Sequence, residues 1–262
     1  MPTILVPLDG SYHAQQALPA ALSLASRDQA SLLLLGVDES YEFFSETAAL
    51  TSYFDALCGR IRAAGWEVTW QVLPGSAAET IASCAHKTGA SLIVMSSHGR
   101  RGLTRWALGS VTERVARAAR CEVLVVRAGT AVNAAQAELA LGNSLAGAGL
   151  AWDKVLIALD GSARAELPLE RAQALAGHSL ELLSVLDFPP PVIGGEIPSG
   201  WVASVGRDAE DQRMRYLEGL AGKLRSSRLE VKVTLRRGAP ADEIVEAAVG
   251  CDLLVMTNGA RP

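Results

Sequence analysis

The strongest constraint on the fold of this chain is that its sequence repeats once. Residues 4–11 read I-L-V-P-L-D-G-S, and residues 155–162 read V-L-I-A-L-D-G-S. A second match follows in the same order, between residues 73–81 and residues 236–244. Copies that start about half a chain apart indicate a duplicated domain, because the repeats of solenoid proteins are only tens of residues long. The 262 residues therefore provide for two domains of about 130 residues each.

Each copy alternates short apolar runs with helical patterns. The runs of the first copy are continuous in hydrophobicity, which is typical of strands whose sheet is covered on both faces. They predict strands at residues 3–8, 31–37, 67–73, 91–96 and 121–127. Segments between them place apolar residues at i, i+3 and i+4, as one face of a helix does. This alternation predicts an α/β protein built from two open parallel sheets with helices on both faces.

The two copies differ in length and are joined by a segment rich in Ala, Gly and Asn. We predict a first domain at 1–128, a linker at 129–152 and a second domain at 153–262. The second copy is expected to stop after its fourth strand, without the last helix and the fifth strand of the first. Pro19 and Pro168 fall within the first helix of each copy, so that helix either bends there or starts late.

Composition narrows the class of protein. A net charge of −4 and 5% aromatic residues argue against nucleic acid and membrane surfaces as partners. The N-terminus lacks the pattern of a signal peptide, and no apolar run reaches the roughly 18 residues of a membrane span. The four cysteines have neither C-x-x-C spacing nor a histidine cluster, which favours small buried hydrophobic residues over a zinc site. We expect a cytoplasmic protein.

An unusual loop follows the fourth apolar run. Residues 96–111 read S-S-H-G-R-R-G-L-T-R-W-A-L-G-S-V. Ser110 followed three residues later by Glu113 fits a capping box, which predicts that Ser110 caps the next helix. Backbone N–H groups at a helix start and in a glycine loop form an anion site, and His98, Arg100, Arg101 and Arg105 add donors. Phosphate is the expected guest, although an ordinary solvated loop would also fit these residues.

Other phosphate and catalytic motifs do not match. A P-loop requires G-x-x-x-x-G-K-[ST], and a dinucleotide fold would place G-x-G-x-x-G after the first strand, where this chain has P-L-D-G-S. A G-x-S-x-G elbow is also missing from the sequence, so a hydrolase triad is not expected. Asp9 follows the first strand, which in an open parallel sheet adjoins the fourth. Asp9 and the loop at 96–111 therefore belong to one candidate site.

The spacing of this loop resembles the universal stress protein family. Members carry G-x-x-G, nine residues and G-[ST] after the fourth strand. Gly99, residues 100–108 and Gly109-Ser110 fit that spacing, Ser96 stands in place of the first glycine, and V-P-L-D-G-S resembles the family's opening. The resemblance implies a Rossmann-like, adenine nucleotide alpha hydrolase-like sheet of five strands in the order 3-2-1-4-5. The duplication is similar to that of tandem members.

The resemblance also implies a ligand, adenine nucleotide, usually ATP with a divalent ion such as Mg²⁺ or Mn²⁺. Asp9 would contact the ribose or the adenine side, and the backbone of Val37 would meet the adenine. The remaining predicted contacts, most of them around the phosphates, are Pro7, Met95, Ser97, His98, Gly99, Arg100, Gly109, Ser110 and Val111. No protein metal ligand is predicted. The second copy keeps Asp160 and Val185 but lacks the glycine motif, so we expect it to bind no triphosphate.

These residues are compatible with three functions to different degrees. The first is an ATP-binding stress-response sensor or scaffold, not an enzyme, with at most slow hydrolysis. The second is a protein-interaction module of the same fold that needs no nucleotide. An adenylyl-transfer or pyrophosphatase-type enzyme is disfavoured, because such enzymes show S-G-G-x-D-S after the first strand. The apolar strand at 121–126 would be an exposed sheet edge, so we also predict a homodimer through it.

Overall fold

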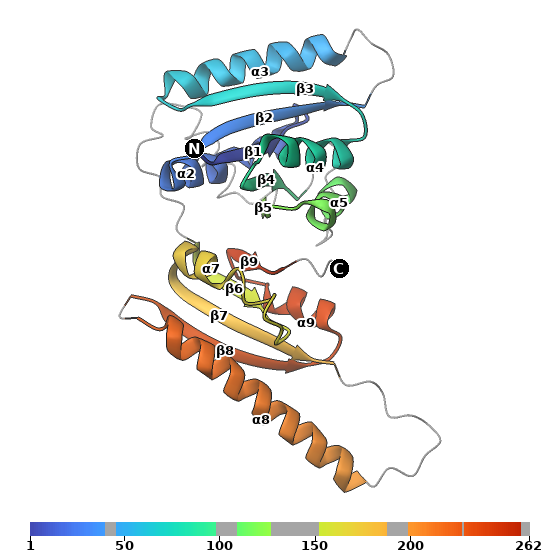
Figure 1. Cartoon of the computed structure of the whole chain (residues 1–262), viewed down its shortest axis with the longest axis vertical. Coiled ribbons are helices and arrows are strands. Elements are labelled where there is room, and N and C mark those ends of the chain that lie inside the picture. Colours follow the sequence, from blue (N-terminus) through green and yellow to red (C-terminus); the bar gives the residue numbers. More distant parts are fainter. Residues whose placement is uncertain (40–45, 98–108, 127–151, 188–198, 227, 258–262) are drawn as a thin grey trace. The chain divides into compact units, whose positions relative to one another are not determined.

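A computed structural model describes residues 1–39, 46–97, 109–126, 152–187, 199–226 and 228–257 (Figure 1). The described residues form two compact units, one within residues 1–150 and the other within residues 151–259. Each unit is a parallel sheet with helices packed against it. The predicted α/β class and the duplication are both confirmed.

The sheet of the first unit has five strands in the order β3-β2-β1-β4-β5, as predicted. Its strands are β1 (Thr3–Pro7), β2 (Ser31–Asp38), β3 (Val68–Pro74), β4 (Leu92–Ser96) and β5 (Glu122–Val126). Its helices are α1 (Tyr12–Gln15), α2 (Leu18–Asp28), α3 (Glu46–Ala63), α4 (Ala77–Thr88) and α5 (Ser110–Ala118). The central strand β1 sets Leu5 opposite Leu33 of β2 on one side and opposite Ile93 of β4 on the other.

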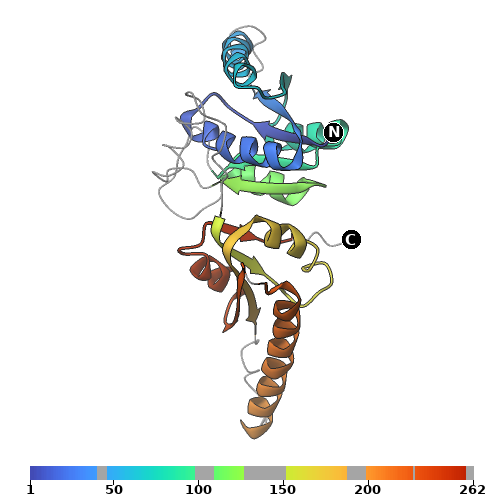
Figure 2. The same ribbon diagram turned by 90° about the vertical axis from the view of Figure 1, so that its left-hand side faces the viewer.

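The described part of the second unit has a sheet of four strands in the order β8-β7-β6-β9, which repeats the order of β3-β2-β1-β4. The strands are β6 (Trp152–Ala158), β7 (Ala176–Leu186), β8 (Glu230–Arg237) and β9 (Leu253–Val255). The helices are α7 (Leu169–Leu175), α8 (Ser199–Leu224) and α9 (Pro240–Ala247). Figure 2 shows α8, in orange, as one long helix, which packs along β7 and β8.

The prolines delay the first long helix in both units. In the first unit α1 ends at Gln15, and α2 begins at Leu18 with Pro19 in its first turn. In the second unit Pro168 is the N-cap residue of α7. A proline fits a helix start because the first N–H groups of a helix have no partner within it. The second unit therefore shows the late start, whereas in the first unit the short helix α1 precedes the proline and α2 begins anew at Leu18.

Two helix layers cover the first sheet. Right-handed crossovers place α2 and α3 on one face and α4 and α5 on the other. On the α4 and α5 face, a buried cluster joins strands to helices through Leu5, Ile93, Ile81 and Val115. On the α3 face, an added Cβ on Gly36 would lie 2.6 Å from Cε2 of Phe54, so only glycine lets that ring approach β2 so closely.

Candidate functional site

The candidate site lies at the carboxyl ends of β1 and β4. After β1 the chain crosses to β2, and after β4 it crosses to β5 on the opposite side of β1. Ligands of open α/β sheets bind at such a reversal of strand order, because the two connections diverge and leave a crevice. Pro7, the last residue of β1, and Met95, in β4, are both buried where the predicted nucleotide-binding residues converge.

The turn after β1 fixes the carboxylate of Asp9 at this crevice. Its Oδ1 accepts a hydrogen bond of 2.9 Å from the N–H of Ser11. Gly10 between them has φ of +78°, a left-handed conformation that glycine adopts without strain. The Oγ of Ser11 in turn accepts from the N–H of Ala14 at 3.2 Å and caps α1. Asp9 is therefore held by its own turn.

The end of β4 forms the other side of the site. Ser96 and Ser97 are buried, and the N–H of Ser97 donates to the carbonyl of Val126 at 2.7 Å. The N–H of Gly109 donates to the carbonyl of Ser97 at 2.8 Å. The chain therefore enters and leaves the segment at 98–108 from one place, beside the carboxyl end of β4. His98, Gly99 and Arg100 belong to that segment and lie outside the described residues.

The prediction that Ser110 caps α5 in a capping box is wrong. Gly109 is the N-cap residue, with φ of −59° and ψ of 149°, and Ser110 is the exposed first residue of the helix. The carboxylate of Glu113 accepts a hydrogen bond of 2.8 Å from Arg117 and does not reach back to the helix start. Gly109 has no side chain, and among the described residues no side chain makes a capping hydrogen bond at the start of α5. A helix start without such a cap is suited to an anionic ligand.

Thr112 is a positioning residue that the motif did not reveal. It is 3% exposed, and its Oγ1 donates to the carbonyl of Ser96 at 3.0 Å. This bond ties the first turn of α5 to the last residue of β4. The threonine at the third helical position after Gly109 is the sequence signal that could have identified it, since Ser and Thr hydroxyls often bond to nearby backbone groups.

We expect Thr112→Val to cost about 1 kcal/mol of stability and to weaken ligand binding at this site, because the isosteric valine cannot tie α5 to β4. Thermal unfolding and nucleotide titration would measure the two effects. Thr88→Val is the matched control, since the Thr88 hydroxyl donates at 2.8 Å to Cys84 within the same helix and joins no two elements. Equal losses of nucleotide affinity in both variants would contradict this role of Thr112.

Tyr53 of α3 is a second residue that motif analysis missed. Its hydroxyl is buried beside the Gln15 side chain and near Asp9. Burial raises the pKa of Tyr53 to about 12, a rise that the Gln15 side chain opposes and the charge of Asp9 increases. The phenol therefore stays protonated at neutral pH and can donate to a ligand beside Asp9.

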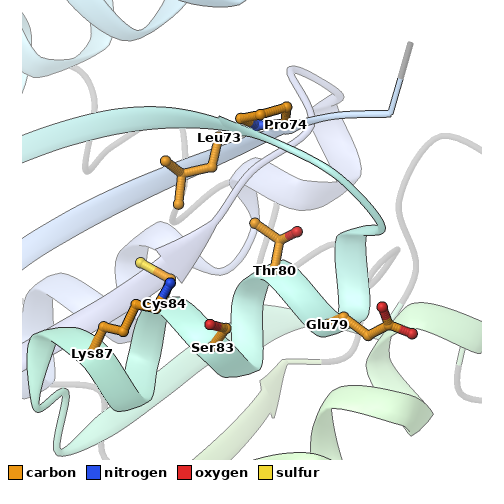
Figure 3. Close-up of a pocket in the computed structure, with 7 residues that line it drawn as sticks. All are labelled: Leu73, Pro74, Glu79, Thr80, Ser83, Cys84 and Lys87. Carbon is orange, nitrogen blue, oxygen red and sulfur yellow. The ribbon is translucent and has the colours of Figure 1, made fainter. Parts of the chain in front are cut away.

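The structure assigns different roles to the other predicted contacts. The side chains of Val37, Met95 and Val111 pack in or against the buried cluster beneath α4 and α5. The backbone contact expected of Val37 stays a prediction. A hollow of about 350 Å³ lies between β3 and α4, with Leu73, Thr80 and Lys87 in its wall (Figure 3). It contains none of the predicted nucleotide-binding residues.

The described residues form neither a cluster of metal ligands nor a membrane-spanning helix. Across the described ranges, no three or more His, Cys, Asp or Glu side chains gather as a metal site would require. No described helix is both long and apolar enough to cross a bilayer. The four cysteines are free thiols; Cys58 and Cys84 are buried, as predicted, whereas Cys121 and Cys251 are only partly buried. Burial is the main cause that raises the pKa of each thiol.

The fold defines a tandem α/β protein, and the candidate site lies where the first sheet reverses its strand order, at β1 and β4. The profile of the Universal stress protein family matches the chain twice, at residues 1–127 and 151–262. The chain therefore belongs to the universal stress protein family. Universal stress protein YxiE of Bacillus subtilis is 31% identical over 146 residues, which cover 47% of this chain and 97% of that protein.

Solved structures agree on the fold across both units. PA1789 from Pseudomonas aeruginosa, a protein of unknown function, aligns with 96% of this chain and 79% of its own, at a TM-score of 0.66 and 17% identity. A universal stress protein from Archaeoglobus fulgidus aligns with 96% of this chain and 85% of its own, at a TM-score of 0.60 and 18% identity. At these identities the likeness concerns the fold alone.

Proposed function

We propose that the first unit binds an adenine nucleotide, ATP with a divalent ion, and that the protein acts as a nucleotide-dependent sensor or scaffold in the stress response. The observation that carries this proposal is the hydrogen bond from Gly109 to Ser97. It brings the start of α5, where the N-cap residue Gly109 offers no capping side chain, to the end of β4 beside the Asp9 turn. The site would belong to a domain at 1–128, joined by a linker at 129–152 to a second domain at 153–262.

Each residue is proposed to bind the part of the nucleotide that its chemistry suits. The carboxylate of Asp9 suits ribose hydroxyls, and the backbone of Val37 suits the edge of the adenine. The first N–H groups of α5, at Ser110 and Val111, suit phosphate oxygens. The N–H groups of Ser97 and Gly109 already donate to carbonyls of the fold, so these two residues shape the site. Tyr53 adds a donor beside Asp9. Mg²⁺ or Mn²⁺ bound to the nucleotide would neutralise phosphate charge.

Binding rather than turnover is proposed because the nearby acidic groups are engaged elsewhere. Oδ1 of Asp9 accepts from Ser11, and Glu113 pairs with Arg117. A general base has to reach the attacking water within hydrogen-bond distance, and neither carboxylate is set aside for that purpose. We therefore propose at most slow hydrolysis, to be measured as ADP formed over hours with ATP and Mg²⁺. The free thiols fit the cytoplasm as the proposed location.

The test of the proposed function uses the full chain. Mass spectrometry of the material released from denatured protein would identify a ligand that copurifies with it. ATP at a hundred times its Kd should stabilise the fold by about 2.7 kcal/mol, which a thermal-shift assay detects. If ATP, ADP and AMP all leave the melting temperature unchanged, the proposal fails and the interaction module that needs no nucleotide takes its place.

We also propose a homodimer formed through β5. This strand is an edge of the first sheet, and Val123, Leu124, Val125 and Val126 make it apolar. An open apolar edge favours pairing with another strand. Light scattering behind a sizing column should therefore give the mass of two chains at micromolar concentration. A monomer at that concentration would contradict the dimer.

A further inference from the structure

The turn of the first unit that holds Asp9 is reproduced in the second unit. Oδ1 of Asp160 accepts from the N–H of Ser162 at 2.8 Å, as Asp9 accepts from Ser11 at 2.9 Å. Gly161 has φ of +87°, close to the +78° of Gly10. The two units can therefore be compared position by position around this turn.

The helix over the turn also corresponds in the two units. Tyr53 of α3 and Tyr216 of α8 each bury a hydroxyl, which lies beside Gln15 in the first unit and beside Glu166 in the second. Three residues before these tyrosines stand Leu50 and Arg213. An added Cβ on Gly10 would find Cδ2 of Leu50 at 3.9 Å, and one on Gly161 would find Nη1 of Arg213 at 2.9 Å. An arginine thus replaces a leucine over the turn.

The guanidinium of Arg213 extends from this turn to the end of the neighbouring strand. Its Nη1 donates at 3.1 Å to Oγ of Ser184, which is 1% exposed. That hydroxyl donates at 2.7 Å to the carbonyl of Leu159, just beyond β6. Ser184 precedes Val185, the counterpart of Val37, so its own counterpart in the first unit is Gly36. Arg213 therefore joins the ends of β6 and β7, where the first unit is proposed to hold ribose and adenine.

We propose that the side chain of Arg213 fills the position that a nucleoside would take in the second unit. The residue at this position of the helix, Leu50 in α3 or Arg213 in α8, then determines which unit binds a nucleoside. Leu50 places an apolar side chain over the turn of the first unit, at 3.9 Å from an added Cβ on Gly10, whereas Arg213 lies closer to its turn, at 2.9 Å, and brings a positive charge to Asp160. The inference rests on the proposed nucleotide site of the first unit. It assigns one nucleoside per chain, bound in the first unit.

The charges around Arg213 stabilise this closed arrangement. Hydrogen bonds from Ser162 lower the pKa of Asp160, and the charge of Arg213 lowers it further. Asp160 is therefore ionised at neutral pH and attracts the guanidinium. Glu166, the counterpart of Gln15, adds a negative charge near Tyr216, whose pKa burial raises to about 12. A neutral nucleoside would have to displace the guanidinium from the ends of β6 and β7. It would not supply the positive charge that faces Asp160.

Binding stoichiometry of adenosine tests the proposal, because adenosine needs no phosphate loop. Calorimetry or equilibrium dialysis on the full chain should give one site for the wild type and two for Arg213→Leu. The converse change, Leu50→Arg, should weaken adenosine binding in the first unit by at least tenfold. A folded Arg213→Leu chain that stays at one site, or a folded Leu50→Arg chain that binds as the wild type does, overturns the proposal.

Arg215→Leu is the control, since it removes the same charge from an exposed position two residues along α8. It should leave the wild-type stoichiometry unchanged, and a second site in this variant would overturn the proposal as well. Circular dichroism would check the fold of each variant. Absence of any adenosine or ATP binding by the wild type rejects the proposed function. In that case the appearance of a site in Arg213→Leu still supports the role of Arg213, and its failure to appear rejects it.

Discussion

Asp9→Ala is expected to lower the affinity of the chain for ATP by roughly ten- to a hundredfold, whereas Asp160→Ala should leave it unchanged. A hydrogen bond to a charged group contributes about 1.5–3 kcal/mol, which corresponds to that range of affinity. The effect is confined to Asp9 because only its turn adjoins the Gly109 start of α5. Isothermal calorimetry with ATP and Mg²⁺ on the full chain would measure both variants.

Asp160→Ala is a matched control because the two turns are built alike. Each variant loses a carboxylate that accepts a backbone N–H, at 2.9 Å from Ser11 or at 2.8 Å from Ser162. Both should therefore lose a similar stability of about 1 kcal/mol, measured by thermal unfolding. If the two variants weaken ATP binding equally, Asp9 acts through the stability of its turn and not as a ligand to the nucleotide.

The strands could be predicted because patterns that are local in the sequence mark them, whereas their order in the sheet was implied by the family resemblance. Continuous apolar runs such as residues 31–37 mark strands covered on both faces, and the observed β2 (Ser31–Asp38) differs by one residue. The copied D-G-S turn identified both units before any coordinates. The start of the first helix could not be chosen in the same way, because Pro19 is compatible with a bend and with a helix start.

The site was predicted less completely, since its geometry depends on contacts between distant segments. Ser110 was expected to cap α5, but the extended backbone of Gly109 makes that residue the cap and leaves the serine inside the helix. Tyr53 lies 44 positions after Asp9 in the sequence, and no spacing rule relates a residue of α3 to the turn after β1. No pattern in the sequence indicates a role for Arg213. Its role follows from the comparison with Leu50, which lies over the Gly10 turn of the first unit.

Phe54→Ala should produce the largest loss of stability in the first unit, about 3–5 kcal/mol, because it opens a cavity in the core. The ring is fully buried between β2 and α3 and stacks on Trp70 with centroids 5.7 Å apart and planes 13° apart. Hydrogen exchange of the β1 and β2 amides in the full chain would report the first unit by itself. Leu217→Ala, at the corresponding buried position of α8, should leave those amides protected and expose amides of β7.

Gly36→Ala probes the same contact from the strand. The new methyl would lie 2.6 Å from Cε2 of Phe54, so we expect overpacking that costs about 1–3 kcal/mol. In the chain with both Gly36→Ala and Phe54→Ala the methyl enters vacated space, and the loss should be smaller than the sum of the single losses. Gly219→Ala in α8, where an added Cβ meets nothing within 4 Å, should not destabilise the fold. Additive losses would mean that the ring yields to the methyl without strain, and that Gly36 is needed for another reason.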